Sequence, residues 1–428
     1  MNASLNPFLE QAQVLDSTDP LNAFKAAFHF PAERLIYLDG NSLGPLPKKT
    51  RTCLRACMEE EWGTGLIRSW NAHWYGLPEK MGDLLAPLLG ARDGEVIFAD
   101  SVTVNLFKLL SAALPYQEGR SVVVSDELNF PSDEYVLEGL LEMTGRRHRV
   151  LRVPSADGIT IDRGAYSAVL DGDTALVLVS HVTFKSGFLH DLKALTEAAH
   201  AVGALVLADL SHSVGAVPLK LEEWGVDLAV GCAYKYLNGG PGAPAFLYVR
   251  KDLQEALLPG LRGWFGSAEP FAFNLDYSPA AGMRRFLVGT PPVLSLRAVE
   301  PGIKLLQEAG MDAVREKSLR LSALLLDFHE AFLAPLGYRL GSPAKASERG
   351  SHLSLRHPEA YRINRALIAP LPGQPVVIPD FRAPDNLRLG LAPLFLSFTD
   401  VVEAGRCLAE IVASRDFERF ANAPDPVT

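Results

Sequence analysis

Residues 205–243, LVLADLSHSVGAVPLKLEEWGVDLAVGCAYKYLNGGPGA, decide the fold of this chain of 428 residues. Residues 205–208 form a short apolar run bounded by a glycine and a polar cluster, which is the pattern of a buried strand, and Asp209 follows at once. A second apolar run, residues 226–233, leads to Lys235 and then to a glycine-rich loop. Because the carboxyl ends of strands in an open α/β sheet face the ligand crevice, we expect this acid and this amine at one site.

An acid and an amine in this arrangement are the two groups that a pyridoxal 5′-phosphate site requires. The amine of Lys235 can form a Schiff base with the aldehyde of the cofactor, and the carboxylate of Asp209 can keep the pyridine nitrogen protonated so that the ring accepts electrons. The glycines that follow leave room for the ring beside the backbone. A capping aspartate and a solvated lysine are the structural alternative, but Lys235 ends an apolar and aromatic run rather than a run of charges, which favours the cofactor.

Composition excludes several classes of protein. A hydrophobic fraction of 48% with 21% charged residues is typical of a globular enzyme, and the length suits two domains. The net charge of −9 and the lack of a basic cluster argue against nucleic acid as a partner. We see no secretory pattern and no apolar run of membrane-spanning length, so we expect a cytoplasmic protein with no membrane partner. The four scattered cysteines predict buried thiols and no metal site.

Strand and helix patterns alternate from residue 95 to residue 249. The segments, in order, are 96–98, 103–113, 121–124, 132–143, 149–153, 175–180, 191–202, 205–208 and 245–249. Such alternation predicts an α/β fold in which a mainly parallel sheet carries helices on both faces. Ahead of it we expect an arm with one short helix near residues 20–29, a strand at 35–38, and helices from residue 47 and at 78–89.

The pattern changes in the last third of the chain. Residues 254–297 have little regular pattern, and a loop of this length is usually functional. The segments that follow read as helices at 302–307, 311–333 and 399–413 and as strands near 338–340, 352–355 and 376–378. We therefore divide the chain into an N-terminal arm (1–45) that packs with the small domain, a large cofactor-binding domain (46–300) and a smaller α+β domain (301–428).

Two strand-to-helix junctions read as walls of a ligand site. Residues 100–103, DSVT, open a helix with hydroxyls and free backbone N–H groups, which suits a phosphate, although an ordinary N-cap has the same pattern. Residues 129–133, NFPSD, open the next helix with a ring and a carboxylate. Phe130 could stack on a pyridine ring, or it could be a hydrophobic staple beside a first-turn acid.

Taken together, the motifs resemble the kynureninases, pyridoxal-phosphate enzymes with the aspartate aminotransferase fold, also called PLP fold type I. The matching stretches, in chain order, are GNSLG at 40–44, VTVNL at 102–106, FPSD at 130–133, DLSHSVG at 209–215, WGVD at 224–227, YKYLN at 234–238, GWFG at 263–266 and PP at 291–292. Each is weak alone, but their shared order over nearly the whole chain is specific.

The resemblance implies a role for each cofactor-site residue. Lys235 would be the Schiff-base lysine, Asp209 the partner of the pyridine nitrogen and Phe130 the stacking ring, and we take Tyr234 as the proton donor. The full cofactor-binding set would be Val102, Thr103, Phe130, Pro131, Ser132, Asp133, Ser180, Asp209, His212, Tyr234, Lys235, Trp264 and Thr290. Trp264 and Thr290 would come from a second subunit, so the resemblance also implies a homodimer with shared active sites.

The substrate side of the site follows from the same resemblance. Arg388, in LRLGLAP at 387–393, resembles the arginine motif of the family and would clamp the α-carboxylate, the alternative being a surface arginine on a strand. The residues expected near the aromatic ring are His73, Trp74, Gly289 and Thr290. Vertebrate members carry asparagine where this sequence has Thr290, and serine where it has Gly289, so we expect a preference for L-kynurenine over its 3-hydroxy derivative.

The implied reaction is hydrolysis of the Cβ–Cγ bond of L-kynurenine to anthranilate and L-alanine, in tryptophan catabolism and NAD biosynthesis. The alternatives are a hydrolase that prefers 3-hydroxykynurenine, or another enzyme of the fold, such as an aminotransferase. A cysteine desulfurase needs a mobile cysteine in the C-terminal domain, and the sequence has none between Cys232 and Cys407. A catalytically silent relative would be expected to lack the Schiff-base lysine, and Lys235 is present.

Overall fold

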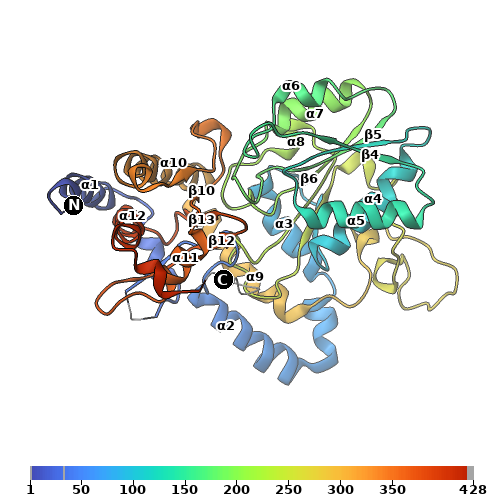
Figure 1. Cartoon of the computed structure of the whole chain (residues 1–428). Coiled ribbons are helices and arrows are strands. Elements are labelled where there is room, and N and C mark those ends of the chain that lie inside the picture. Colours follow the sequence, from blue (N-terminus) through green and yellow to red (C-terminus); the bar gives the residue numbers. More distant parts are fainter. Residues whose placement is uncertain (1, 32–33, 422–428) are drawn as a thin grey trace.

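The computed structural model describes residues 2–31 and 34–421, and a seven-stranded sheet lies at its centre (Figure 1). The strands lie in the order β2-β8-β7-β6-β5-β3-β4. Their bounds are β2 Val96–Phe98, β3 Val122–Asp126, β4 Arg149–Val153, β5 Thr174–Ser180, β6 Leu205–Asp209, β7 Leu228–Gly231 and β8 Phe246–Val249. The five neighbouring strands β7, β6, β5, β3 and β4 run parallel to one another, whereas β8 is antiparallel to both of its neighbours, β2 and β7. The predicted α/β fold with a mainly parallel sheet is confirmed.

Alternate side chains of the central strands enter two separate apolar cores. In β5, Leu176 and Leu178 pack on one side of the sheet and Val177 and Val179 on the other, because successive side chains of a strand point to opposite faces. The helices around the sheet are α3 Leu77–Leu89, α4 Val102–Tyr116, α5 Pro131–Met143, α6 Arg163–Ser167, α7 Leu192–Ala201, α8 Leu221–Trp224 and α9 Val293–Ala309. α4 and α5 close one core, and α3, α7 and α9 pack on the other. With both faces covered, the central strands β5 and β6 are buried along their whole length and are apolar except at their ends.

The C-terminal part is built on a four-stranded antiparallel sheet in the order β12-β13-β10-β9. Its strands are β9 Arg339–Leu340, β10 His352–Arg356, β12 Asp380–Arg382 and β13 Asn386–Gly390, and its helices are α10 Met311–Phe328, α11 Ala360–Ile368 and α12 Phe398–Ala413. In the pairing of β12 with β13, Asp380 lies directly opposite Arg388. This register places two side chains of opposite charge on one face of the sheet.

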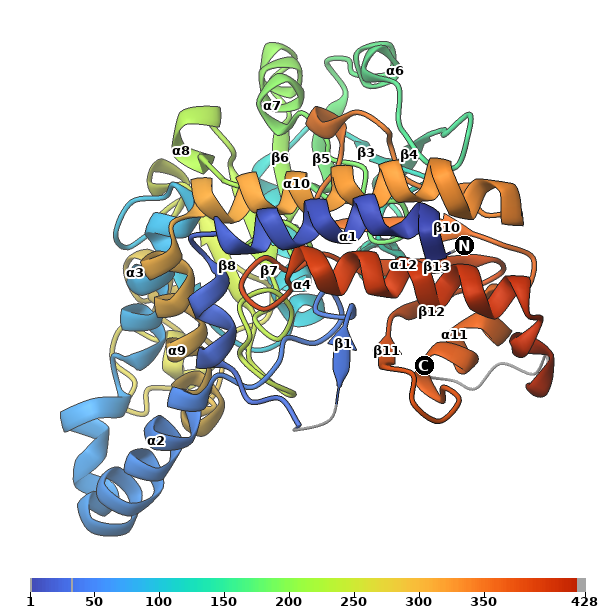
Figure 2. The same ribbon diagram turned by 90° about the vertical axis from the view of Figure 1, so that its left-hand side faces the viewer.

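The N-terminal helix α1 (Asn2–Ser17) lies beside α10 and α12, as Figure 2 shows. The ring of Phe8 packs edge-on against Phe328 of α10, with 5.4 Å between the ring centroids. The carboxylate of Asp16 accepts hydrogen bonds from the backbone N–H groups of Phe398 (2.7 Å) and Thr399 (3.0 Å). Asp16 thus caps the start of α12, which removes two unpaired donors from that helix end.

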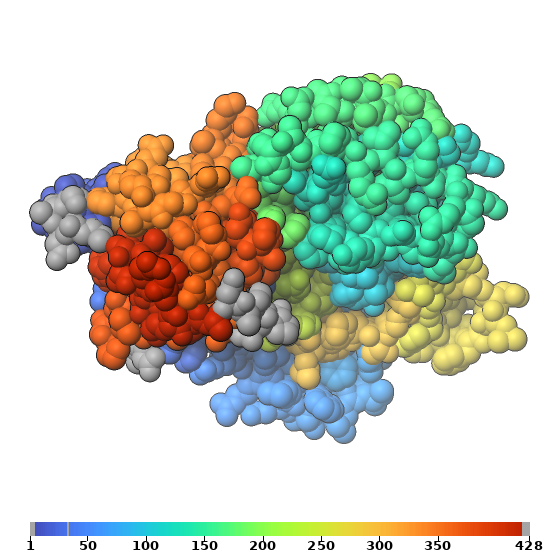
Figure 3. Space-filling model, viewed as in Figure 1, coloured from blue at the N-terminus to red at the C-terminus, as the bar shows by residue number. Residues whose placement is uncertain are grey.

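A two-stranded parallel sheet also joins the arm to the C-terminal part. It pairs β1 (Leu35–Tyr37) with β11 (Val376–Ile378). In the space-filling view the C-terminal part, orange and red, packs against the part built on the large sheet, green (Figure 3). α9 passes without a break through residue 300, so the division of the chain at residues 45 and 300 stays a prediction.

The N-terminal prediction is wrong in one respect. The arm contains the long helix α1 and a 3-10 turn at Asn22–Ala27, instead of one short helix near residues 20–29. The sequence of α1 mixes polar and apolar residues, with Pro7 inside it, and few of its residues are buried. Its stability comes from packing on α10 and α12, which no local pattern reports.

Two further predictions fail at boundaries. α9 begins at Val293, directly after two prolines, and continues through Pro301, where we expected an irregular loop and a later start. β7 ends at Gly231, so Lys235 lies in a turn rather than at the strand end itself. In addition, we did not predict the helix α11 or the short strand β12 from the sequence. Within the described residues, no helix is both long enough and apolar enough to span a membrane.

Candidate active site

Eight of the thirteen predicted cofactor residues line a hollow at the carboxyl end of the large sheet. This hollow has a volume of about 160 Å³ and is lined by Ser101, Val102, Thr103, Phe130, Ser132, Asp133, Asp209, Ser211, Cys232, Tyr234, Lys235, Ala243 and Ala245. Asp209 comes from the tip of β6, and the first residues of α4 and α5 form two further walls. Segments far apart in the sequence are therefore brought together as the α/β pattern predicts.

Asp209 is held in one orientation by the residues that follow it. Its Oδ1 accepts hydrogen bonds from the backbone N–H of Ser211 (2.9 Å) and from the Ser211 hydroxyl (2.6 Å). The side chain is buried, and burial raises the pKa of Asp209. The sequence prediction omitted Ser211, although an aspartate followed two residues later by serine is the pattern of a turn closed by the aspartate side chain.

Lys235 lies in a tight turn, with its amine directed at His212. The distance from Lys235 Nζ to His212 Nε2 is 3.1 Å, and both side chains are buried. Burial and then the positive charge of Lys235 lower the pKa of His212, so its imidazole is neutral. Gly44 closes the turn from outside, because a side-chain carbon there would overlap the carbonyl oxygen of Lys235. This explains why a glycine ends the GNSLG segment.

Phe130 lines the hollow, and Ser180 contacts its backbone. The centre of the Phe130 ring lies 5.9 Å from Lys235 Nζ. Ser180 accepts a hydrogen bond from the backbone N–H of Phe130 (3.3 Å) and donates one to Asn129 Oδ1 (2.6 Å). Ser180 therefore orients the stacking ring and the start of α5.

Asp133 is a buried acid in the hollow that lacks hydrogen-bond partners among the described residues. Its side chain is fully buried, and neither carboxylate oxygen has a hydrogen-bond partner among the described residues. Burial, and then the neighbouring carboxylate of Asp209, raise the pKa of Asp133. Leaving a buried carboxylate unpaired costs on the order of 1–3 kcal/mol or more, so the hollow is suited to a ligand that brings hydrogen-bond donors.

The start of α4 provides an anion site at the other end of the hollow. The N-cap Ser101 accepts from Val104 N, and Val102 and Thr103 of the first turn line the hollow, where the N–H groups of a helix start suit an anion. The Thr103 and Ser132 hydroxyls lie 3.5 Å apart. A phosphorylated pyridine aldehyde needs an anion site for its phosphate, an amine for its aldehyde and a carboxylate for its ring nitrogen. The hollow has an anion site, a lysine amine and two buried carboxyl groups, so the residues fit pyridoxal phosphate.

Comparison of the sequence with known proteins identifies relatives of the chain. A family model described as the kynureninase C-terminal domain matches residues 314–408. Kynureninase of Pseudomonas fluorescens is 43% identical over 403 residues, covering 93% of this chain and 94% of that protein. The chain belongs to the kynureninase family. Kynureninase of Burkholderia pseudomallei K96243 is 42% identical over 408 residues, covering 94% of this chain and 95% of its own.

Solved structures place the family within a broader fold. A cysteine desulfurase of Thermococcus onnurineus NA1 superposes with a TM-score of 0.77 at 17% identity, covering 94% of this chain and 98% of its own. The lyase C-DES, solved as a variant with glycine covalently linked to its PLP cofactor, has a TM-score of 0.75 at 18% identity and covers 88% of this chain and 96% of its own. At these identities the likeness shows the fold alone, which is PLP fold type I.

Arg388, which we predicted to bind the substrate carboxylate, lies on β13 and is 2% exposed, which excludes the alternative of a surface arginine. Its Nη1 donates to the carbonyl oxygen of Phe184 (2.7 Å) and its Nη2 to the hydroxyl of Ser42 (2.9 Å). Its Nε donates to Asp380 Oδ2 at 2.6 Å. The sequence prediction omitted these three partners because they come from separate segments of the chain, and only Ser42 lies in a motif, GNSLG.

The residues predicted around the substrate ring lie elsewhere in the chain's own structure. The predicted ring and cofactor residues that do not line the hollow are His73, Trp74, Pro131, Ser180, His212, Trp264, Gly289 and Thr290. Trp74 is buried, and its indole N–H donates to Glu61 Oε2 at 2.7 Å. Trp264 is 42% exposed on a 3-10 turn, Trp264–Gly266. Their roles as ring and cofactor contacts stay predictions.

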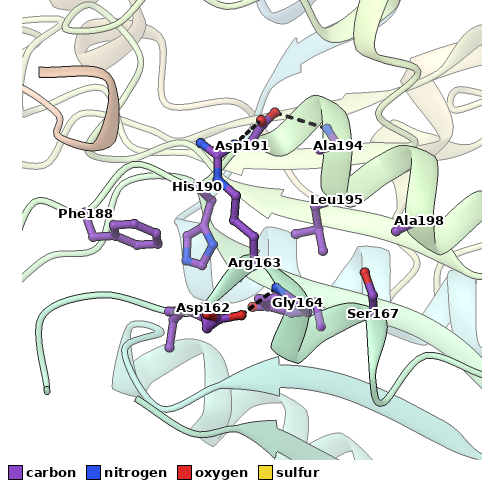
Figure 4. A pocket seen from close by; sticks show the side chains of 12 residues that line it. Asp162, Arg163, Gly164, Ser167, Phe188, His190, Asp191, Ala194, Leu195 and Ala198 are labelled. Carbon is purple, nitrogen blue, oxygen red and sulfur yellow. Dashed lines mark hydrogen bonds and ion pairs between the residues drawn. The ribbon is translucent and has the colours of Figure 1, made fainter. Parts of the chain in front are cut away.

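A second cavity, of about 330 Å³, lies between α6 and α7 and is drawn in Figure 4. Arg163 extends across it to an ion pair with Asp191 at 3.2 Å (Figure 4). Asp191 and Asp162 cap the two helices by accepting from backbone N–H groups. None of the predicted site residues lines this cavity, so we place the chemistry at Lys235.

Proposed function

We propose that the protein hydrolyses L-kynurenine to anthranilate and L-alanine in tryptophan catabolism, with pyridoxal phosphate held on Lys235. The observation that carries the proposal is the meeting of Lys235, Asp209 and the partnerless Asp133 in one buried hollow of a kynureninase-family chain. When bound, the cofactor supplies an electron sink for the α-carbon of the substrate. All other steps fall to side chains of this chain.

Lys235 and its neighbours carry the proton transfers at the α-carbon. The Lys235 amine, released by the substrate amine, takes the α-proton. His212 stays neutral, so it can accept a hydrogen bond from that amine without adding a second positive charge. Asp209 holds a proton at the pyridine nitrogen, and its fixed contact with Ser211 keeps the carboxylate in the orientation this requires.

Tyr234 is the proposed proton donor for the later steps. Burial raises the pKa of Tyr234, so the phenol keeps its proton until a basic atom forms beside it. Water adds to the γ-carbonyl, the Cβ–Cγ bond breaks, and the β-carbon then needs a proton to become the methyl group of alanine. Arg388 holds the α-carboxylate throughout.

We include a homodimer in the proposal, with Trp264 and Thr290 contributing to the partner's site. Two exposed apolar groups support it. One is Met58, Trp62, Leu66 and Ile67 on and after the projecting helix that begins with α2 (Lys48–Ala56), and the other is Trp264, Phe271, Phe273 and Leu275. Large exposed apolar patches mark interaction surfaces. A cytoplasmic location and a contribution to NAD biosynthesis belong to the same proposal and rest on family membership.

The ring preference forms the finer part of the proposal. With Gly289 and Thr290 in place of the vertebrate serine and asparagine, the site offers the 3-hydroxyl group fewer hydrogen bonds, so L-kynurenine should be preferred. A hydrolase that prefers 3-hydroxykynurenine is the runner-up. An aminotransferase would share Lys235, Asp209 and Arg388 but would need a keto-acid acceptor.

One assay separates these functions. Purified protein is incubated with pyridoxal phosphate and L-kynurenine, without any keto acid, and the fluorescence of anthranilate is followed while L-alanine is measured. We expect both products in equal amounts. Product formation only when a keto acid is added would favour the aminotransferase and overturn the proposal.

A further inference from the structure

The arginine that would bind the substrate carboxylate already has an internal carboxylate as partner. Asp380 lies directly across the sheet from Arg388, and the two side chains are 1% and 2% exposed. Asp380 Oδ2 accepts from Nε of Arg388 at 2.6 Å and also from Nη2. A single carboxylate oxygen thus occupies the side edge of the guanidinium, the edge formed by Nε and Nη2.

The second oxygen of Asp380 is occupied as well. Its Oδ1 accepts from Nη1 of Arg382 at 2.8 Å, on the same strand. The backbone pairing of β12 with β13 fixes the relative position of all three side chains. Asp380 is therefore a buried and doubly anchored group, which has little freedom to swing away from Arg388 when a ligand arrives.

The remaining donors of Arg388 face different partners. Nη1 donates to the carbonyl oxygen of Phe184, a residue of the large-sheet part, and Nη2 donates also to Ser42 of the N-terminal arm. A guanidinium has five N–H donors and can take a carboxylate along its end edge, between Nη1 and Nη2. With the side edge occupied by Asp380, a substrate carboxylate would have to bind at the end edge, where it would replace the Ser42 hydroxyl as the partner of Nη2.

We propose that Asp380 is the positioning residue of the carboxylate site: it holds the side edge of Arg388, so that the end edge is presented to the α-carboxylate of the substrate. This inference rests on the proposed function, in which Arg388 binds that carboxylate. The opposite role would be a placeholder, a carboxylate that occupies Arg388 in the resting protein and competes with the substrate. The two roles predict opposite effects when the negative charge of Asp380 is removed.

The test uses Asp380→Asn in the pyridoxal-phosphate-loaded protein and two simple ligands. L-Alanine and ethylamine share the amine and the methyl group, and only L-alanine has a carboxylate. Both are titrated while the cofactor absorbance is followed, which measures binding without any hydrolysis of kynurenine. A positioning role predicts that the Kd of L-alanine rises about tenfold while that of ethylamine stays within about twofold, because only the carboxylate uses Arg388.

A matched control lies on the same sheet. Asp385 also contacts an arginine through two N–H groups, at 3.1 and 3.0 Å from Arg356 Nε and Nη2, but this pair is partly exposed. Asp385→Asn should leave both Kd values unchanged. If Asp380→Asn does not fold, as judged by its thermal unfolding, Asp380→Glu takes its place, because the longer side chain shifts the oxygen away from Nε.

The outcomes are distinct. A lower or unchanged Kd of L-alanine in the Asp380 variant overturns the positioning role, since a placeholder that is removed favours the ligand. An equal weakening of L-alanine and ethylamine also overturns it, because that result places the defect at the amine rather than at the carboxylate. If the unmodified protein binds both ligands but does not hydrolyse kynurenine, the proposed function fails while the assignment of Asp380 can still be decided by these titrations.

Discussion

The amine of Lys235 lies 3.1 Å from Nε2 of His212, and the two groups cannot both carry a positive charge at this distance without a large cost. Burial and Lys235 together lower the pKa of His212, so the histidine is the neutral member of the pair. Asp209 and Asp133 line the same hollow, where burial raises the pKa of both carboxyl groups and the positive charge of Lys235 opposes that rise. The first prediction concerns the loss of the Lys235 amine.

Lys235→Ala should abolish turnover, with a loss on the order of 10³-fold or more, because the variant lacks both the covalent anchor and the general base. The measurement is anthranilate formation by variant and unmodified protein at saturating pyridoxal phosphate. Borohydride treatment of the unmodified protein followed by peptide mapping supplies the control. Attachment of the cofactor to a peptide without Lys235 would refute the assignment.

Arg388→Ala should lower kcat/KM by the equivalent of about 2–5 kcal/mol, because the α-carboxylate of the substrate loses its charged partner in a buried site. The absorbance of the bound cofactor should stay as in the unmodified protein, since no cofactor contact changes. Arg388→Lys tests geometry, because a lysine cannot offer two parallel N–H groups. Near-normal use of kynurenine by either variant contradicts the assigned role.

Gly289→Ser combined with Thr290→Asn should shift the preference toward 3-hydroxykynurenine. The effect should be modest, on the order of 1–3 kcal/mol in transition-state binding, because one substrate hydroxyl is concerned. The comparison is kcat/KM for the two substrates on a single preparation of each protein. If the unmodified enzyme uses the 3-hydroxy compound equally well or better, the ring-pocket argument fails and the family assignment stands.

Asp39→Asn should stabilise the protein at neutral pH. Burial, and then the Asp380 carboxylate, raise the pKa of Asp39 to about 6, from the usual value of 3.8. The folded state thus binds a proton more tightly than the unfolded chain, so charged Asp39 destabilises the fold above pH 6, and this cost fades as the pH falls from 6 toward 4. The gain at pH 8 should be at most about 3 kcal/mol in the free energy of unfolding.

Urea unfolding at pH 8 and at pH 4.5 checks this sign. Asp157→Asn is the control of opposite sign, because hydrogen bonds from Thr160 and Ile159 outweigh burial and lower the pKa of Asp157. A stabilisation by Asp39→Asn that is equal at both pH values would contradict the titration argument.

Strong local patterns were enough to predict the large sheet and the cofactor hollow. The runs before Asp209 and near Lys235 combine apolar strands with an isolated polar group, and that contrast can be read along the chain. The surroundings of Arg388 could not be predicted in this way. Ser42, Phe184 and Asp380 are far from one another in sequence, and only the packing of the arm, the large sheet and the small sheet brings them to one guanidinium. α1 was missed for the same reason, since its helical state depends on partners at the other end of the chain.

The cap that Asp16 places on α12 has a consequence for the order of folding during synthesis. The two ends of that contact are 382 residues apart, so α1 leaves the ribosome long before the helix it will cap exists. The large sheet can form first from segments that follow one another closely, whereas α1 must wait beside a nearly finished chain until α12 emerges. A nascent chain stalled before residue 398 would therefore leave uncovered the side of α1 that packs on α12, although α10 is already present.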